Sequence, residues 1–233
     1  MSDVGSTESP KSEGAASPAR ERTEPWSDRA ELYRTSPVHM AGEDLDLMVE
    51  WATGFNTALD VATGGGHVAR RLREAGLQVV TADPAPGMQP DVICPAEHLP
   101  FADGSFDVVA CRRAAHHFDD VAGAVLEMAR VSNTLVILQD AIRVNDRIEH
   151  AERLRDPSHV SHYTEDEWRG YFADAGLEVD AAESFVEYLD FESWLARTGC
   201  EGDAALEVRD LLAEETVGDG WNYPHIVFRA RKR

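Results

Sequence analysis

Leu59-Asp60-Val61-Ala62-Thr63-Gly64-Gly65-Gly66-His67 is the stretch that decides the fold of this chain. A short apolar run ends at three consecutive glycines, which predicts a buried strand that turns sharply into a helix. Glycine accepts positive φ and lets a ligand approach the backbone, and the N–H groups that open a helix attract polar ligand groups. The stretch is therefore a candidate nucleotide pocket. The pattern Gly64-x-Gly66-x-x-Ala69 also fits the dinucleotide fingerprint, which is a weak signal by itself.

The segments on either side of this turn complete a βαβ unit. Periodicity predicts a strand over 57–62, a helix over 67–75 and a second strand over 77–82 that ends at Asp83. Asp83 lies 19 positions after Gly64, close to the spacing of about 20 at which nucleotide-binding α/β folds place a carboxylate on the ribose hydroxyls. The order of elements predicts a right-handed crossover, half of a nucleotide-binding fold.

The rest of the chain continues to alternate between strands and helices. The predicted fold is α/β and Rossmann-like: a doubly wound, mostly parallel seven-stranded sheet with helices on both faces and an antiparallel C-terminal strand. Thr164 to Glu167 reads as a capping box, and the prolines of 84–90 exclude a full helix there. Further strands are expected over 91–94, 107–111, 134–138, 177–189 and 225–230, and further helices over 45–52, 121–130, 145–155, 165–175, around Trp194 and over 204–215.

Charge restricts the classes of partner. The chain has 43 acidic and 22 basic residues, a net charge of −21, and its lysines are Lys11 and Lys232 alone. Nucleic acid is not an expected partner, because phosphate binding needs a basic surface. An acidic, lysine-poor surface suits a high-salt cytoplasm, where ions screen the self-repulsion, and adaptation to such a medium is a hypothesis.

The chain shows no membrane or secretion signal. No apolar stretch approaches the length of about 20 residues that spans a bilayer, and the N-terminus is too polar for a secretory signal. A cytoplasmic location is expected. The three cysteines are widely spaced, which argues against a disulfide framework or a thiolate metal site. Residues 1–28 are rich in Ser, Pro, Gly and Glu and read as a disordered tail, and 29–233 as one domain.

Several motifs in the right order resemble one enzyme family. They are Leu59 to Gly66, Asp83, Ala96-Glu97-His98-Leu99-Pro100-Phe101, Ser105-Phe106-Asp107-Val108-Val109 and Ala115-His116-His117-Phe118. Over residues 36–180 the chain resembles the class I S-adenosylmethionine-dependent methyltransferases, and within them the type 11 group that includes the ubiquinone and menaquinone C-methyltransferases. The resemblance implies a cofactor-binding core over 56–142 and a substrate lid over 143–170. It implies S-adenosylmethionine as cofactor and a small molecule as methyl acceptor.

The resemblance also implies where the cofactor lies. Asp60 would hold the glycine loop through its amides or reach the ammonium of the methionine moiety, Asp83 would take the ribose hydroxyls, and Ala96-Glu97 would face the adenine. Pro95 departs from the family, which commonly has an aspartate there, and proline offers neither carboxylate nor N–H. Ala62 stands where the family has a glycine. The full set of expected cofactor contacts is Asp60, Ala62, Thr63, Gly64, Gly66, His67, Asp83, Ala96, Glu97 and Arg112.

Two other functions stay open at this point. A dehydrogenase that uses NAD(P) would share the glycine turn, although a carboxylate at Asp60 would repel a pyrophosphate there. A binding module without catalytic activity could also retain the fold.

Histidines supply the candidate chemistry. An oxygen or carbon acceptor needs a general base, and His116 or His117, just past the strand over 107–111, is the candidate. Arg155, His159, His162 and Tyr163 lie in the expected lid and are candidate substrate contacts. No metal site is expected, because no histidine spacing supports one. The sequence does not set the oligomeric state.

Overall fold

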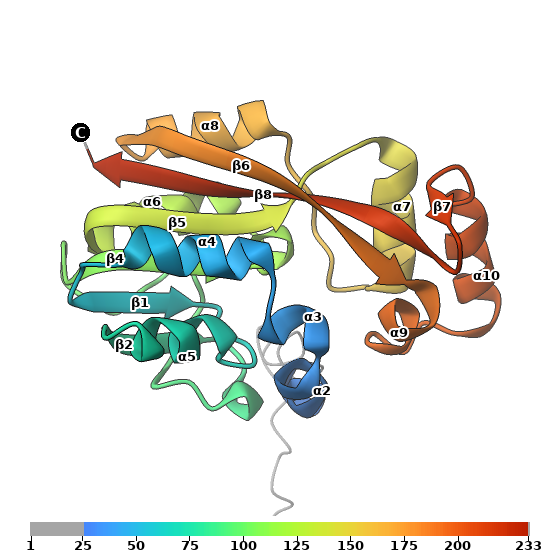
Figure 1. Ribbon diagram of the computed structural model, residues 1–233, viewed down its shortest axis with the longest axis horizontal. Helices are drawn as coiled ribbons and strands as arrows, with labels where there is room; N and C mark the ends of the chain where they lie inside the picture. The colour runs from blue at the N-terminus through green and yellow to red at the C-terminus, as the bar shows by residue number, and fades with distance from the viewer. Residues whose placement is uncertain (1–25, 233) are drawn as a thin grey trace, which may run out of the picture.

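A twisted sheet with helices on both faces forms the body of the molecule (Figure 1). The computed structural model describes residues 26–232. Along the sheet the strands follow the order β3-β2-β1-β4-β5-β8-β6, and β7 pairs with β8. Their bounds are β1 Thr57–Val61, β2 Gln78–Asp83, β3 Val92–Ile93, β4 Phe106–Arg112, β5 Ser132–Ala141, β6 Leu177–Asp190, β7 Thr216–Val217 and β8 Gly220–Lys232.

The sheet is parallel from β3 to β5, and β8 runs antiparallel to both β5 and β6. This confirms the doubly wound, mostly parallel fold expected from the sequence. Within the described residues the sheet has eight strands rather than seven. The additional strand β7 is only two residues long and forms a hairpin with β8 around Gly218, whose φ is 59°. A strand of two residues is too short for the hydrophobic periodicity of the sequence to predict it.

Helices cover the two faces because successive strand residues point to opposite sides. Val109 and Cys111 pack with α6 and α8, whereas Val108 and Ala110 pack with α4 and α5. The helices are α2 Ala30–Thr35, α3 Pro37–Met40, α4 Glu43–Ala52, α5 His67–Glu74, α6 Val121–Val131, α7 Asp146–Arg155, α8 Glu165–Asp174, α9 Phe191–Ala196 and α10 Gly202–Leu211, with 3-10 turns η1 Pro86–Met88 and η2 Ala115–His117.

Local signals explain several helix ends. Asp120 accepts a hydrogen bond from the Gly123 N–H at 2.9 Å and caps α6. The capping box of Thr164 and Glu167 is present at the start of α8, as expected. The proline-rich segment after β2 forms only the short turn η1. None of the described helices is long and apolar enough to cross a membrane.

A separate lobe, the distal lobe, lies beyond the carboxyl end of the parallel strands. The long strands β6 and β8 extend past the other strands, and α7, α9 and α10 pack around their far ends (Figure 1). Trp194 and Trp221 are both fully buried in this lobe. Residues 26–28 are helical, although the expected disordered tail included them, and the rest of that tail lies outside the described residues.

Candidate active site

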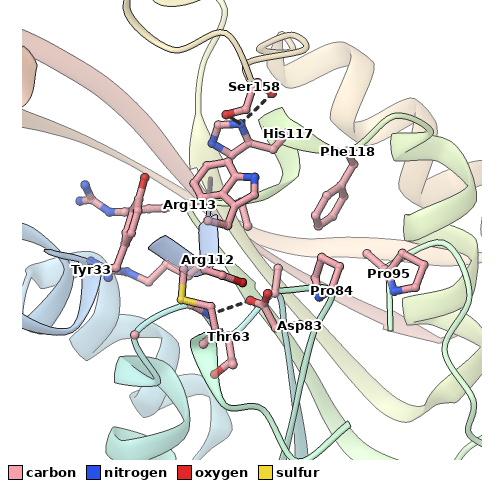
Figure 2. Close-up of a pocket in the computed structure, with 18 of the residues that line it drawn as sticks. Tyr33, Thr63, Asp83, Pro84, Pro95, Arg112, Arg113, His117, Phe118 and Ser158 are labelled. Atoms are coloured by element: carbon pink, nitrogen blue, oxygen red, sulfur yellow. Dashed lines mark hydrogen bonds between the residues drawn. The ribbon is translucent and has the colours of Figure 1, made fainter. Parts of the chain in front are cut away.

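A cavity of about 1060 Å³ opens at the carboxyl ends of β1, β2 and β4 (Figure 2). Ligands bind at this edge of open α/β sheets, so the position matches the expectation from the glycine turn. Of the residues predicted to contact cofactor, eight line the cavity, namely Ala62, Thr63, Gly64, His67, Asp83, Ala96, Glu97 and Arg112. Asp60 and Gly66 do not, and Gly65 does instead.

The glycine loop brings bare backbone to the cavity. Gly64 has a φ of 50°, and no atom lies within 4 Å of where a Cβ would sit, so the loop leaves space for a ligand. Ala62 takes the same left-handed region, with a φ of 53°. For alanine this conformation costs roughly 1–2 kcal/mol. The loop therefore keeps the backbone shape of a glycine at a position that carries a methyl group.

The buried side chain of Asp60 holds this loop in place through hydrogen bonds. Its carboxylate accepts hydrogen bonds from the Thr63 hydroxyl at 2.6 Å and from the Ala69 N–H at 3.0 Å, and the residue is 1% exposed. Burial raises the pKa of Asp60 to about 6. Of the two roles considered for Asp60, the structure shows the loop-holding one, and a direct cofactor contact is not supported because its side chain lies outside the cavity.

Asp83 joins the loop to the end of β2. One carboxylate oxygen accepts a hydrogen bond from the Gly64 N–H at 3.0 Å (Figure 2). The other oxygen accepts from the Ala85 N–H at 2.9 Å. A carboxylate has about four acceptor positions, so further positions remain for hydroxyl donors in the cavity. Burial raises the pKa of Asp83 from its ordinary value.

The far end of the cavity is apolar. Met88, Ile93, Cys94 and Phe118 line it together with Pro95. Glu97 accepts a long hydrogen bond of 3.4 Å from the Asp120 N–H at the start of α6. The side chain of Pro95 reaches the cavity (Figure 2), where it supplies an apolar wall and no hydrogen bond.

Arg112 serves the fold through its guanidinium. It forms a two-point ion pair with Asp44, at 2.8 and 3.0 Å, and donates to the His39 carbonyl at 3.0 Å. Both charged side chains are almost fully buried. Arg112 lines the cavity, where a cofactor contact was expected, and its guanidinium is already paired with Asp44.

The two adjacent histidines have different environments. His116 Nδ1 lies 2.6 Å from Asp140, whereas His117 Nδ1 lies 3.1 Å from the Ser158 carbonyl oxygen (Figure 2). Burial works to lower the pKa of His116, but the Asp140 carboxylate outweighs it and the pKa is raised. Burial, followed by the charge of His116, holds the pKa of His117 well below its ordinary value. Only His117 lines the main cavity.

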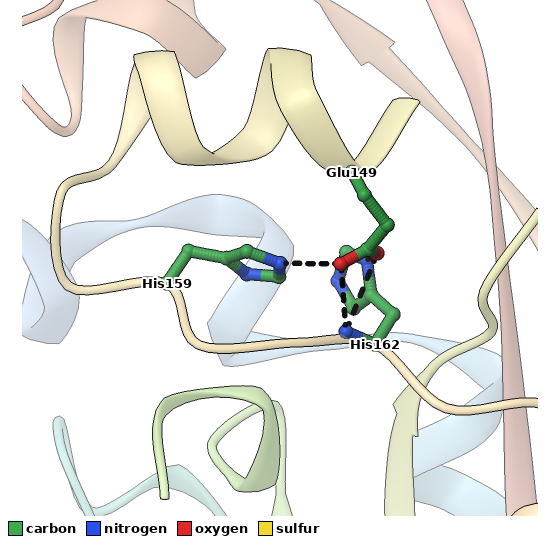
Figure 3. Close-up of side chains that lie close together, drawn as sticks. All are labelled: Glu149, His159 and His162. Atoms are coloured by element: carbon green, nitrogen blue, oxygen red, sulfur yellow. Dashed lines mark hydrogen bonds and ion pairs between the residues drawn. The ribbon is translucent and has the colours of Figure 1, made fainter. Parts of the chain in front are cut away.

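The expected lid is held by a buried carboxylate. Glu149 of α7 accepts from His159 Nε2 at 3.2 Å and from His162 Nδ1 at 2.8 Å (Figure 3). The three ligating atoms lie within 4.8 Å of one another, a grouping that suits a metal ion and that the sequence spacing did not indicate. Hydrogen bonds within the protein satisfy the same grouping: each histidine donates one ring N–H to Glu149, and His162 Nε2 accepts from the Tyr223 hydroxyl at 3.2 Å.

The four predicted substrate contacts therefore lie in different surroundings. His159 lines the main cavity, and His162 is buried behind it against Glu149. Tyr163 packs against Trp168 and Tyr171 and is not among the cavity residues. Arg155 faces a smaller recess nearby.

Sequence reasoning missed the N-terminal wall of the cavity. Trp26 packs edge-on against His117 with ring centroids 4.5 Å apart, and Tyr33 accepts from His67 Nε2 through its carbonyl at 3.0 Å. Ser27 accepts from the Gly87 N–H at 3.1 Å, and a Cβ on Gly87 would lie 2.5 Å from the Ser27 Cα. The available signal was Trp26 itself, the one aromatic residue in an otherwise polar segment.

Comparison with known proteins decides the family. A family model described as "Methyltransferase domain" matches residues 59–134. The uncharacterised methyltransferase YcgJ of Bacillus subtilis is 32% identical over 208 residues, which is 79% of this chain and 82% of YcgJ. The chain belongs to the class I S-adenosylmethionine-dependent methyltransferases. The alternative of a nicotinamide-dependent dehydrogenase is thereby set aside.

Solved structures agree with this methyltransferase in fold. The crystal structure of YcgJ has a TM-score of 0.72 at 28% identity and covers 82% of this chain and 98% of that one. The Bacillus halodurans protein BH2331 gives the same TM-score and identity, with 82% and 99% covered. Magnesium protoporphyrin IX methyltransferase from Synechocystis, solved with its cofactor S-adenosylmethionine, has a TM-score of 0.57 at 14% identity, with 94% and 100% covered, a likeness of fold.

The cofactor of this methyltransferase is S-adenosylmethionine, and the cavity residues fit it. The open Gly64 backbone suits the methionine moiety, the free acceptor positions of Asp83 suit the ribose hydroxyls, and the apolar walls around Pro95 suit an adenine ring. The cavity volume of about 1060 Å³ leaves room for a second small molecule beside the cofactor.

Proposed function

We propose that this methyltransferase transfers a methyl group to a small molecule by in-line displacement, with His117 as the general base. The cofactor supplies an activated methyl group on a sulfonium leaving group. An acceptor lone pair forms the new bond to the methyl carbon as the carbon–sulfur bond breaks, and the electron pair of that bond returns to sulfur. The proton that the acceptor loses goes to His117.

The observation that carries this proposal is the state of the His117 ring. Its Nδ1 lies 3.1 Å from the Ser158 carbonyl, so the N–H belongs on that nitrogen and the lone pair on Nε2. Among the described residues Nε2 has no hydrogen-bond partner. The lowered pKa keeps the ring neutral near pH 7. A neutral imidazole at the cavity wall is a group that can take a proton.

His116 does not suit the same role. Asp140 binds its Nδ1 at 2.6 Å and raises its pKa, so the ring is charged and carries no free lone pair below that pKa. The positive charge of His116 lowers the pKa of His117 in turn. We infer that His116 positions and tunes His117 rather than touching the acceptor.

Labelled cofactor tests the proposal. The protein is incubated with trideuteromethyl S-adenosylmethionine and a deproteinised small-molecule extract of its source organism, and labelled products are sought by mass spectrometry. We expect a labelled product, and His117→Gln should slow its formation by about 10²- to 10⁴-fold. His98→Gln, an exposed histidine outside the cavity, is the matched control.

Each outcome separates the alternatives. A His117→Gln rate within twofold of the wild type would show that His117 is not the base. If the wild type binds S-adenosylhomocysteine in calorimetry but labels nothing, the chain is a binding module that retained the fold.

A further inference from the structure

A small recess adjoins the cofactor cavity beyond His117. Its volume is about 70 Å³, and it shares with the main cavity the residues Trp26, Tyr33, His39, Arg113 and His117. Its far wall comes from the distal lobe and from β5, through Arg155, Trp194, Arg197, Tyr223 and Asp140. The recess therefore lies on the acceptor side of the proposed base, away from the glycine loop.

Three arginines line this recess: Arg113, Arg155 and Arg197. Such a grouping is unexpected in a chain that has only 22 basic residues against 43 acidic ones. Arg113 and Arg155 have counter-charges. Arg113 pairs with Glu187 at 2.7 Å, while Arg155 lies 3.6 Å from Glu152 and 3.7 Å from Asp156 and stacks 4.5 Å over Trp194.

Arg197 differs from the other two. Within residues 26–232 its guanidinium has no hydrogen bond and no ion pair, although the side chain is largely enclosed. Burial, followed by the charge of Arg155, lowers the pKa of Arg197 to about 10, which still leaves it charged at neutral pH. A charged group that is taken from water without a partner is unfavourable. A ligand group that paired with Arg197 would remove this penalty.

The other charges around the recess do not supply that partner. Asp140 is the only carboxylate among the described residues that line it, and His116 already binds Asp140 at 2.6 Å. The pKa of His39 shows the effect of these positive charges. Burial first, and then the charges of Arg113, Arg197 and Arg112, lower this pKa well below its ordinary value. The recess is thus a positively charged site in a strongly acidic protein.

We propose that the recess binds an anionic group of the methyl acceptor, a carboxylate or a phosphate, with Arg197 as the principal contact. A guanidinium presents a planar fork of donors that matches both groups. The Tyr33 hydroxyl offers a further donor at the same wall. Held there, the acceptor would extend from Arg197 past His117 into the main cavity. This inference rests on the proposed function and adds the acceptor's chemical class.

Calorimetry on protein saturated with S-adenosylhomocysteine tests the proposal, with sodium phosphate and sodium acetate as probes at constant ionic strength. Saturation matters because the cofactor also carries a carboxylate. We expect at least one anion to bind, and Arg197→Gln to weaken it tenfold or more. Arg169→Gln, which removes an exposed arginine of α8 and changes the net charge equally, should leave anion binding within twofold. The stronger probe identifies the class of group.

Several results would overturn the inference. Equal anion binding by Arg197→Gln and wild type would remove Arg197 as the contact, as would no anion binding by the saturated wild type. If Arg197→Gln instead weakens S-adenosylhomocysteine itself, the arginine serves the cofactor and the acceptor proposal fails. Failure of the wild type to bind S-adenosylhomocysteine would count against the proposed function, and is measured separately in the saturation step.

Discussion

The Asp83 carboxylate accepts a hydrogen bond from the Gly64 N–H at 3.0 Å and so ties the end of β2 to the glycine loop after β1. One side chain thereby shapes the loop and faces the cavity. Asp83→Asn should weaken S-adenosylhomocysteine binding by about 1–3 kcal/mol, as for lost hydrogen bonds to a charged group. Isothermal titration measures this. Asp91→Asn, which removes a carboxylate that accepts from the Thr81 N–H of the same strand, should leave the affinity unchanged. Unchanged affinity in Asp83→Asn would make Asp83 a turn residue only.

Asp60 should make the protein less stable as the pH rises. Its pKa is about 6 in the folded chain and its ordinary value is 3.8, so the folded state holds this proton more tightly. Stability from Asp60 is therefore lost between about pH 4 and pH 6. Asp60→Asn keeps an oxygen for Thr63 and Ala69 and removes the charge. Relative to wild type, the variant should gain stability across this window, on the order of 2 kcal/mol. Urea unfolding at pH 4 and pH 7 measures the difference, and a gap that does not widen with pH contradicts the assignment.

The buried pair of His116 and Asp140 should stabilise the fold over a defined pH range. Burial opposes the charge of Asp140, but His116 lowers its pKa to about 2, and Asp140 raises the pKa of His116. The carboxylate's contribution is lost as the pH falls from about 4 toward 2, and the histidine's as the pH rises through its raised pKa. Asp140→Asn should therefore destabilise most between about pH 4 and 6.5, by roughly 3–5 kcal/mol.

Denaturant unfolding at pH 5 and pH 9 checks this prediction. The double variant with His116→Gln provides the control, because it removes both partners and tests whether the loss comes from their interaction. An Asp140→Asn penalty that is the same at pH 9 as at pH 5 would contradict a charged His116.

Glu149, His159 and His162 should act as a hydrogen-bonded lock rather than a metal site. Burial would raise the pKa of Glu149, but hydrogen bonds from both histidines outweigh it and hold the pKa well below the ordinary value. The carboxylate is thus charged and fully used by protein donors. Glu149→Gln should lower stability by roughly 1–3 kcal/mol and speed amide exchange over residues 157–163. Elemental analysis of untagged protein tests the metal directly, and a stoichiometric divalent ion would falsify the lock.

Salt should stabilise this protein. With a net charge of −21, the negatively charged side chains repel one another in the folded state. Salt weakens this repulsion, because the Debye length falls from about 10 Å at 0.1 M to about 3 Å at 1 M salt. We expect the melting temperature to rise between low and molar potassium chloride. A melting temperature that stays level or falls over this range contradicts the hypothesis of a protein adapted to high salt.

Local chemistry made much of the fold predictable. The strand before Gly64, the carboxylate at Asp83 and the capping box at Thr164 each depend on residues a few positions apart, and each is present. The capping box sets the start of α8 in the same way that the glycines set the turn into α5. Such features can be predicted without knowing how the rest of the chain folds.

Pairings across the chain could not be predicted. Asp44 lies 68 positions before Arg112, and its carboxylate pairs with the guanidinium of this expected cofactor contact. Glu149 was one residue of an ordinary amphipathic helix until folding placed it against His159 and His162. No periodicity reports which acid will meet which base, because that depends on how the layers pack.

The segment over 26–36 contributes no strand to the sheet, yet it covers the cavity through Trp26 and Tyr33 and is held by side-chain hydrogen bonds to other parts of the molecule. Ser27 and Arg34 bind the backbone of Gly87, and Arg29 donates to the Thr198 carbonyl in the distal lobe. Because this segment forms a wall of the cavity, we expect spent cofactor to leave past it before fresh cofactor enters. We therefore expect the turnover frequency to follow how fast these contacts break and re-form, so that product release, and not bond making, limits the enzyme.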